Sequence, residues 1–276
     1  MQKISQSKTI ILPINKLGKN YLPFIKDLEV HKIKYIDIHQ SLILNENNEL
    51  VMSFLSGFYL SITDRFGTIV SDNISTAFFQ PTAMLGERVL IDKHISLQNS
   101  YVFNSITPAE AGIGQFVTIT FYWDEDKFSS YNSNKKTYKE TVELLLSPST
   151  SIQRVEKIKF PDIRTFANKR IRSIRPAWKE CSVSPLGYQS INNGTEEPSS
   201  IEYSIYLTLA NGNYKLIDHL DLSLLKDTGF IDSISFNDLL VNFPDSYIEV
   251  YIDYGSVNNL PTEVRSIPMI IEYVEG

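Results

Sequence analysis

The side chains that could carry out chemistry are few and scattered in this sequence. The histidines lie in separate segments, without the spacing that would put two imidazoles on one helix face: His31, His39, His94 and His219. A metal ion would have to rely on tertiary proximity alone, and an isolated histidine is more often a core or surface residue. We therefore predict no metal site.

Three consecutive carboxylates, Asp124-Glu125-Asp126, follow the most regular strand pattern of the chain. They could hold a calcium ion, but the sequence around them lacks the glycine-containing loop of oxygen ligands that makes such a site specific. A solvated strand end is the interpretation we prefer. The sequence also lacks a glycine-rich phosphate loop, a dinucleotide fingerprint and a nucleophile elbow, so no cofactor is predicted.

The single cysteine, Cys181, stands in WKECSVSP without a nearby histidine or a helix start that would activate it. One cysteine excludes an internal disulfide framework and a cysteine-based zinc site. Asn193-Gly194-Thr195 matches a glycosylation acceptor, but we interpret it as a turn because the chain shows no secretion signal. No catalytic residue can be singled out, and the sequence predicts a protein that is not an enzyme.

The composition is that of a globular protein. A chain of 276 residues suits two domains, and its 42% apolar and 21% charged residues exclude a disordered chain. The N-terminal apolar run, Ile10–Ile14, is too short for a signal-peptide core or a membrane span. We therefore expect synthesis in the cytoplasm, with no signal peptide and no membrane-spanning segment.

Charge is distributed unevenly along the chain, although the net charge is only −6. Basic residues gather between Arg154 and Lys179, whereas the chain from Glu196 onward is acidic. The two regions could complement each other between neighbouring copies in an assembly, or each could be a solvated face. The acidic balance and the lack of interleaved aromatic residues in the basic stretch argue against a nucleic-acid-binding surface.

Short β-type segments alternate with turn residues at the spacing expected of sandwiches and barrels. In the first half we predict strands at Lys32–Ile38, Leu50–Phe54, Phe58–Thr63, Thr68–Val70, Arg88–Ile91, Tyr101–Phe103 and Phe116–Trp123. The clearest pattern is QFVTITFYW, which would put Val117, Ile119, Phe121 and Trp123 on one face. Such alternation predicts a sheet with one buried face, and the fold class is all-β.

A segment near the start of the chain occurs a second time. LPFIKDLEVHKIKYIDI, residues 22–38, aligns without a gap on FPDIRTFANKRIRSIRP, residues 160–176, at an offset of 138 positions. Four further pairs follow in the same order: Tyr59–Ile62 with Tyr206–Leu209, Thr68–Val70 with Lys215–Ile217, Ser100–Val102 with Ser246–Ile248, and Phe116–Trp123 with Pro268–Val274. The Asn-Gly turn at 211–213 occupies the same place in the repeat as the turn at 64–67, as expected of equivalent hairpins. We infer a tandem duplication.

The duplication predicts two tandem antiparallel β-sandwich domains of jelly-roll type. We place the boundary at the Ser147-Pro148-Ser149 linker, which gives residues 1–147, with a polar loop near their end, and residues 148–276. The segment just before it, Thr137–Leu146, could be the last strand of the first domain or a short helix, because periodicity does not decide between them.

Two tandem all-β domains of this size resemble the double jelly-roll major coat proteins of small tailless icosahedral bacteriophages. The resemblance covers nearly the whole chain and lies in the order of the paired segments 22–38 and 160–176, 58–63 and 205–209, and 116–123 and 268–274. It implies a self-assembling capsid protein of the virion, made in the host cytoplasm, whose chains form trimeric, pseudo-hexameric capsomers beside other virion proteins. It assigns no catalytic, cofactor-binding or metal-binding residue.

Two other interpretations stay open. Immunoglobulin-like connectivity of the same strands would suit an accessory head or connector protein of a tailed phage. A carbohydrate- or cell-surface-binding module would expose aromatic rings that stack on sugars. Exposure of Trp123 and Trp178 would favour that module, and burial of both would count against it. A hydrolase built on a β-sandwich comes last, because no pair of carboxylates stands out.

Overall fold

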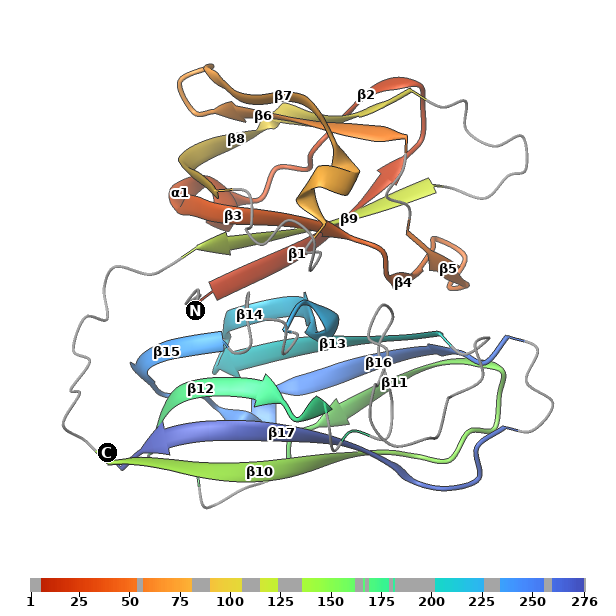
Figure 1. Ribbon diagram of the computed structural model, residues 1–276, viewed down its shortest axis with the longest axis vertical. Coiled ribbons are helices and arrows are strands. Elements are labelled where there is room, and N and C mark those ends of the chain that lie inside the picture. The colour runs from red at the N-terminus through yellow and green to blue at the C-terminus, as the bar shows by residue number, and fades with distance from the viewer. Residues whose placement is uncertain are drawn as a thin grey trace. The chain divides into compact units, whose positions relative to one another are not determined.

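The computed structural model describes residues 6–53, 57–80, 90–105, 115–123, 136–161, 166, 169–178, 181, 202–225, 234–255 and 260–275. Strands form most of this part of the chain, as Figure 1 shows, so the predicted all-β class is confirmed. Contacts divide the chain into two compact units. The N-terminal unit spans Gln6–Asp124, and the C-terminal unit begins at Glu125.

Each unit is built from strands with short helical connections. The elements of the N-terminal unit are β1 (Gln6–Ile14), β2 (Gly18–Tyr21), α1 (Lys26–Val30), β3 (Lys32–His39), β4 (Leu42–Leu44), β5 (Leu50–Met52), β6 (Phe58–Asp64), β7 (Ile69–Ser75), the 3-10 helix η1 (Thr76–Phe79), β8 (Leu90–Asn104) and β9 (Gln115–Trp123). Those of the C-terminal unit are β10 (Thr137–Leu146), β11 (Gln153–Lys159), β12 (Arg170–Pro176), β13 (Glu202–Asn211), β14 (Tyr214–Asp221), η4 (Leu222–Leu224), β15 (Ile234–Leu239), η5 (Phe243–Asp245), β16 (Tyr247–Asp253) and β17 (Arg265–Val274).

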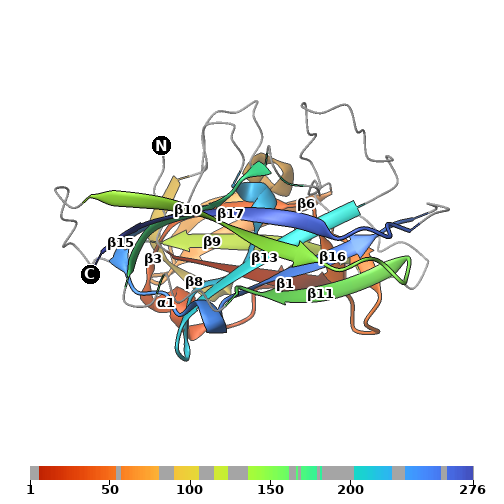
Figure 2. The ribbon, with the colours of Figure 1, turned by 90° about the horizontal axis from the view of Figure 1, so that it is seen from below.

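The strands of the C-terminal unit pair in a nested order. One antiparallel sheet has the order β10-β17-β12-β15, and the other has the order β11-β16-β13-β14. The first strand therefore pairs with the last and the second with the second-last, which is the connectivity of a jelly roll. Both views show β10 beside β17 (Figure 1, Figure 2). Immunoglobulin-like connectivity, in which the first two strands are sheet neighbours, does not describe this unit.

The N-terminal unit repeats this order, with one strand shared between its sheets. The sheets are β1-β9-β3-β8 and β2-β8-β6-β7, because β8 pairs with β3 through its first part and with β6 and β2 through its later part. Long β8 thus takes the place of β15 and β16. We predicted two strands here, Arg88–Ile91 and Tyr101–Phe103. The structure joins them into one, and residues 88 and 89 lie outside the described residues.

Equivalent residues of the two units pair in the same register, which confirms the duplication. Four cross-strand pairs illustrate it: Tyr59 with Phe103 and Tyr206 with Glu249, then Ser61 with Tyr101 and Thr208 with Tyr247. The repeat also starts where predicted, because the backbone N–H of Leu22 donates to Ser100 O at 3.0 Å and that of Phe160 donates to Ser246 O at 3.2 Å. The shared sequence pattern therefore encodes a shared hydrogen-bond pattern.

A buried serine side chain joins two strand segments in each unit. In the N-terminal unit, Ser100 Oγ accepts from the backbone N–H of Thr63 at 3.0 Å and donates to Ser96 O at 2.7 Å. The matching bonds of the C-terminal unit run from Ala210 N–H to Ser246 Oγ at 3.0 Å and from Ser246 Oγ to Asn242 O at 2.9 Å. Both serines are fully buried, so the hydroxyl satisfies backbone groups that water does not reach.

Strand β9 is buried on both faces. The residues predicted to share a face enter the core of the N-terminal unit: Val117, Ile119, Phe121 and Trp123. The prediction of a single buried face is wrong, since the alternate residues are buried as well. Their hydroxyls are paired inside the unit, Thr118 with Ser41 at 3.0 Å and Thr120 with Thr9 at 2.9 Å. These pairs remove most of the cost of burying polar side chains.

The domain boundary lies earlier than the sequence suggested. Thr137–Leu146 forms β10, which pairs along its whole length with β17 at the far end of the chain. The N-terminal unit already ends at Asp124. The strand that we placed at the end of residues 1–147 is therefore the first strand of the C-terminal unit, and the helical alternative for it is wrong. A pairing partner this distant leaves no trace in local periodicity.

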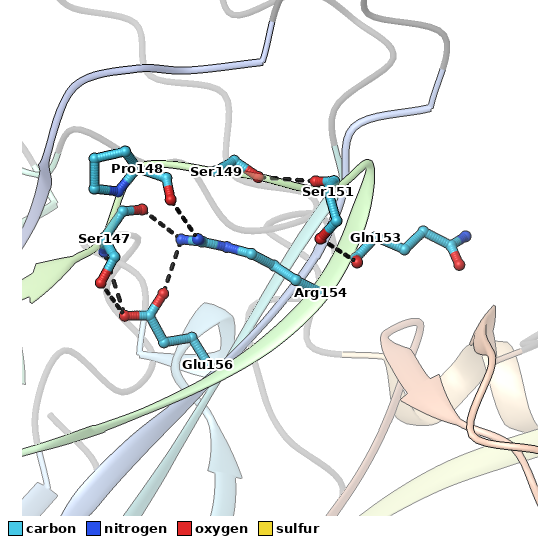
Figure 3. A network of polar contacts seen from close by, with 7 residues as sticks. All are labelled: Ser147, Pro148, Ser149, Ser151, Gln153, Arg154 and Glu156. Atoms are coloured by element: carbon cyan, nitrogen blue, oxygen red, sulfur yellow. Dashed lines mark hydrogen bonds and ion pairs between the residues drawn. The ribbon is translucent and has the colours of Figure 1, made fainter.

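The predicted linker at Ser147-Pro148-Ser149 is instead a corner inside the C-terminal unit, where the chain passes from one sheet to the other. Figure 3 shows Arg154 of β11 reaching back into it. Its guanidinium donates to Ser147 O at 2.6 Å and to Pro148 O at 2.9 Å, and pairs with Glu156 at 2.8 Å. Glu156 also accepts from the Ser147 hydroxyl at 2.8 Å. One charged network therefore fixes the crossing between the sheets.

We expect Ser100→Ala and Ser246→Ala each to lower the free energy of unfolding by about 1–2 kcal/mol, because each leaves a buried backbone N–H without its acceptor. Urea unfolding of the purified chain measures this. Ser151→Ala, at an exposed position, is the control and should change stability by less than about 0.5 kcal/mol. Equal effects at all three serines would contradict the assignment.

Arg154→Ala should destabilise the C-terminal unit by about 2 kcal/mol, because the variant removes charge-assisted bonds to two carbonyls and leaves Glu156 without its cation. Only 14% of the Arg154 side chain is exposed, so solvent screens this network weakly. Lys159→Ala, on the same strand but exposed, is the matched control. Thermal unfolding that is unchanged by Arg154→Ala would show that the corner needs no charged network.

Candidate functional site

The outer faces of the sheets β2-β8-β6-β7 and β11-β16-β13-β14 carry the most distinctive side-chain arrangement in the described residues. A lysine ammonium lies over a tyrosine ring in each: Lys19 Nζ is 4.4 Å from the ring centre of Tyr101, and Lys157 Nζ is 3.3 Å from that of Tyr247. Both pairs join equivalent strands in equivalent register. Because the same cation–π contact occurs at equivalent positions of both units, we assign it to the shared fold. Each such contact stabilises by about 0.5–1 kcal/mol at an exposed site.

The N-terminal unit has a hollow on this face, with a volume of about 230 Å³. It is lined by Lys19, Tyr21, Ser61, Thr63, Ile69, Asp72, Asn99 and Tyr101. Tyr21 lies opposite Tyr101 across β2 and β8, and their rings meet edge to face at 5.8 Å. The lining therefore combines aromatic surface with a cation, a carboxylate, an amide and hydroxyls.

The corresponding face of the C-terminal unit holds a compact aromatic and charged cluster. The His219 ring stacks on Tyr206, with ring centres 4.0 Å apart, and Tyr251 packs edge-on against both rings. His219 Nδ1 lies 3.2 Å from a carboxylate oxygen of Glu249. Strands β13, β14 and β16 thus each contribute a side chain to the cluster, which we call the His219 cluster.

The backbone of His219 itself lies in the left-handed region. Asn73 and His219 occupy equivalent bulges with φ values of 47° and 58°, and the backbone N–H of each donates to the hydroxyl of the equivalent residue, Ser61 or Thr208. Asparagine tolerates this conformation better than other side chains do. The C-terminal unit has a histidine at this position. His219 therefore gains a stacking contact with Tyr206 but adopts this backbone conformation less readily than an asparagine would.

Two pKa values in the His219 cluster depart from the ordinary range. The hydrogen bond from His219 lowers the pKa of the Glu249 carboxyl below 4.5, and the nearby charges of Lys157 and Lys215 act in the same direction. Burial raises the pKa of the Tyr251 hydroxyl to about 12, and the negative charge of Glu249 adds to the rise. The cluster is therefore built around an ionised carboxylate and a neutral tyrosine.

The His219 imidazole contacts the rings of Tyr206 and Tyr251 and the carboxylate of Glu249, and a carboxylate partner of this kind orients an imidazole. In the described part of the chain, no group of three or more His, Cys, Asp or Glu side chains could hold a metal ion. Nor does any described helix have the length and apolar character that a bilayer crossing needs.

The histidines lie in different segments of the fold. His31 stacks on Trp123 with ring centres 5.2 Å apart, His39 is buried at the end of β3, His94 lies in β8, and His219 belongs to the cluster described above. Cys181 is half-buried, and its Sγ lies 3.5 Å from Ser266 O. The acidic run Asp124–Asp126 and the Asn193–Thr195 acceptor lie outside the described residues.

Both tryptophans are buried, Trp123 at 5% exposure and Trp178 at 3%, and the Trp178 indole donates to Leu225 O at 2.9 Å. This counts against a sugar-binding face built on tryptophan. Several basic residues of the 154–179 stretch make contacts inside their own unit. Arg154 fixes the corner, and Lys157 and Lys169 lie over tyrosine rings.

Sequence reasoning missed the hollow and its equivalent. The signal was present, because Lys19 and Lys157 are separated by the same 138 positions as the repeat that begins at Leu22. Extending that alignment three residues upstream would have paired the two lysines. Nothing in the sequence, however, showed that Tyr101 would lie beneath one of them, because that contact depends on the register between β2 and β8.

The geometry defines a tandem jelly-roll protein. In comparisons with known proteins, no family model and no curated protein matches the sequence. Among solved structures the chain is similar to the infectious bursal disease virus VP2 subviral particle, with a TM-score of 0.24 and 10% identity over 100% of this chain and 74% of that chain. The structure of the Gx strain of the same virus gives a TM-score of 0.21 and 10% identity over 99% and 70%. Both similarities are low.

Glu249→Gln should make stability less sensitive to acid. The folded state holds the Glu249 pKa below its unfolded value, so the ionised form contributes stability that is complete above about pH 4.5 and is lost as pH falls through the lowered folded pKa. Urea midpoints measured between pH 7 and pH 3 should therefore fall less steeply in the variant. Glu263→Gln, at an exposed position of the same unit, is the control. A wild-type acid profile in Glu249→Gln would refute the role of the pair.

Proposed function

We propose that the chain is a virion structural protein, a self-assembling coat protein whose trimers form six-lobed capsomers. The observation that carries the proposal is the repetition of one jelly roll, in the same strand order and the same register, within a single chain. Three such chains present six nearly equivalent lobes, which allows a threefold assembly to occupy a position of near-sixfold symmetry. The bacteriophage coat proteins that the sequence resembles have the same organisation.

The surface of the N-terminal unit supports association with other chains. Its turns and connections expose large aromatic side chains: Phe24 at 56%, Phe66 at 79% and Phe78 at 50%. Aromatic residues are enriched in the buried centres of protein interfaces and often carry much of the binding energy. Single exposed apolar residues are common on monomers, so the test is whether these three side chains become buried in the assembly.

The proposal gives the chain an assembly role, with no catalytic role and no cofactor. Its partners are then further copies of itself and other virion proteins. The connectivity described above disfavours the alternative of an accessory protein with immunoglobulin-like domains.

Light scattering of the purified protein should give a mass of about three times the 31.5 kDa chain, because a closed trimer is the proposed building block. Negative-stain images of the same peak should show compact particles with a hexagonal outline. A larger ring would indicate a connector. A mass of one chain that persists on concentration would exclude a self-assembling coat protein.

Changing Phe24, Phe66 and Phe78 singly to Ser maps the contacts. At least one variant should shift the mass towards the monomer, since truncation of an interface anchor typically costs about 2 kcal/mol or more of binding. Thermal unfolding of the dissociated chain is the control and should change little, because at least half of each side chain is exposed.

A further inference from the structure

We propose that the hollow on the N-terminal unit binds the ring of an uncharged saccharide. The inference goes beyond the assembly role and does not rest on it. Three observations carry it: the composition of the hollow, the different side chains at the equivalent positions of the C-terminal unit, and the balance of charge in the lining.

The hollow is built across all four strands of its sheet. Tyr101 on β8 lies opposite Tyr21 on β2 and Ser61 on β6, so these three residues form one row across the sheet face. The outer strands β2 and β7 place Tyr21 and Ile69 on opposite sides of it, and these side chains are 52% and 61% exposed. Rigid strands therefore hold apolar surface at both sides of a polar floor.

The polar groups of the hollow have bonding capacity left. The described contacts of Asp72 comprise one side-chain hydrogen bond, which its carboxylate accepts from the Ser61 hydroxyl at 3.2 Å. Lys19 contacts the Tyr101 ring and has no carboxylate partner within the described residues. Asn99 donates to Ser96 Oγ at 3.0 Å, which leaves its amide oxygen as an acceptor. A ligand with several hydroxyl groups could bond to all three side chains.

The equivalent positions of the C-terminal unit carry different side chains. Shared register pairs Tyr21 with Lys159 and Thr63 with Ala210, whereas the lysine–tyrosine pair is retained. It also pairs Ile69 with Lys215, so the sequence alignment of Thr68–Val70 with Lys215–Ile217 is wrong by one position. The residue equivalent to Asp72 is Asp218, which follows from the equivalent bulges at Asn73 and His219. Lys215 Nζ lies 2.7 Å from Asp218 and so neutralises it. Both units share the fold, yet only the N-terminal unit has an isoleucine where the other has Lys215. The fold alone therefore does not require Ile69 beside Asp72.

Charge and size narrow the chemistry of the ligand. Asp72 would repel an anion such as phosphate, and Lys19 would repel a quaternary ammonium ion, although tyrosine rings otherwise suit such cations. An uncharged ligand that both donates and accepts hydrogen bonds satisfies both groups. The volume of about 230 Å³ is below the range of roughly 300–1,000 Å³ of sites for drug-sized molecules, so it suits a single ring. A sugar ring meets both conditions, since its C–H face packs on tyrosine while its hydroxyls bond at the edge.

Saturation-transfer NMR on the full-length protein tests the proposal. The probes are D-glucose, D-galactose, N-acetyl-D-glucosamine and L-rhamnose, each alone at millimolar concentration. Tetramethylammonium and inorganic phosphate serve as charged reference probes. We expect transfer to at least one sugar with a dissociation constant on the order of 1 mM, as is typical of a ligand with few heavy atoms, and no transfer to the charged probes.

Two substitutions in the hollow have a matched control in the other unit. Ile69→Lys copies Lys215 and should pair with Asp72, and Asp72→Asn removes the carboxylate while keeping its shape. Each should weaken sugar binding at least about tenfold, the effect of losing one bond to a charged group. Asp218→Asn, at the equivalent position, should leave binding unchanged. Ile69 and Asp72 are exposed, so an unchanged melting temperature confirms that the variants fold.

Every other outcome counts against the site. The proposal is overturned if no sugar shows transfer, if phosphate or tetramethylammonium binds and the sugars do not, or if Ile69→Lys and Asp72→Asn bind as the wild type does. Loss of binding in Asp218→Asn alone would place the site in the C-terminal unit. Because the readout is binding by the purified chain, it is independent of the mass measured by light scattering.

Discussion

The pairing of the first strand with the last is the constraint on which each unit depends. β1 pairs with β9 over nine positions, from Gln6 opposite Trp123 to Ile14 opposite Gln115, and β10 pairs with β17 in the same manner. Every other strand of the unit lies between these two strands in the chain. Contacts between such distant residues carry a large loop-closure entropy, and folds rich in them fold slowly. The buried serines, the bulges and the corner at Arg154 all stabilise segments that lie between the first and the last strand of a unit.

The sequence was informative wherever structure is local or repeated. The hairpin at Asn211–Asn213 is present, with Gly212 at a φ of 61°, and the strand predicted at Phe58–Thr63 differs from β6 by a single residue. The 138-residue offset placed Leu28 and Phe166 as equivalent residues, and both are buried. The repeat gave information that periodicity alone did not. A position that is apolar in both copies is one at which the fold requires a buried side chain.

Predictions from sequence failed where a strand is defined by its partner. β10 reads TYKETVELLL, whose alternation is weak, and only its pairing with β17 shows to which unit it belongs. The serine and proline residues at 147–149 have the composition of a linker, yet a guanidinium seven residues away binds their carbonyls. The candidate site was missed for the same reason. The residues of the hollow come from four strands, and the sequence of a single strand does not determine its register with its neighbours.

The closure of each unit has a consequence for its origin. Because Gln6 lies opposite Trp123 and Thr137 lies opposite Val274, each jelly roll begins and ends on neighbouring strands of the same sheet, at the same end of the pair. A second copy of the gene segment could therefore be fused in frame without passing through either sandwich and without opening a sheet. The ancestor of this chain needs only to have been one self-contained jelly roll, and after fusion each copy could change its outer sheet face while its closure stayed intact.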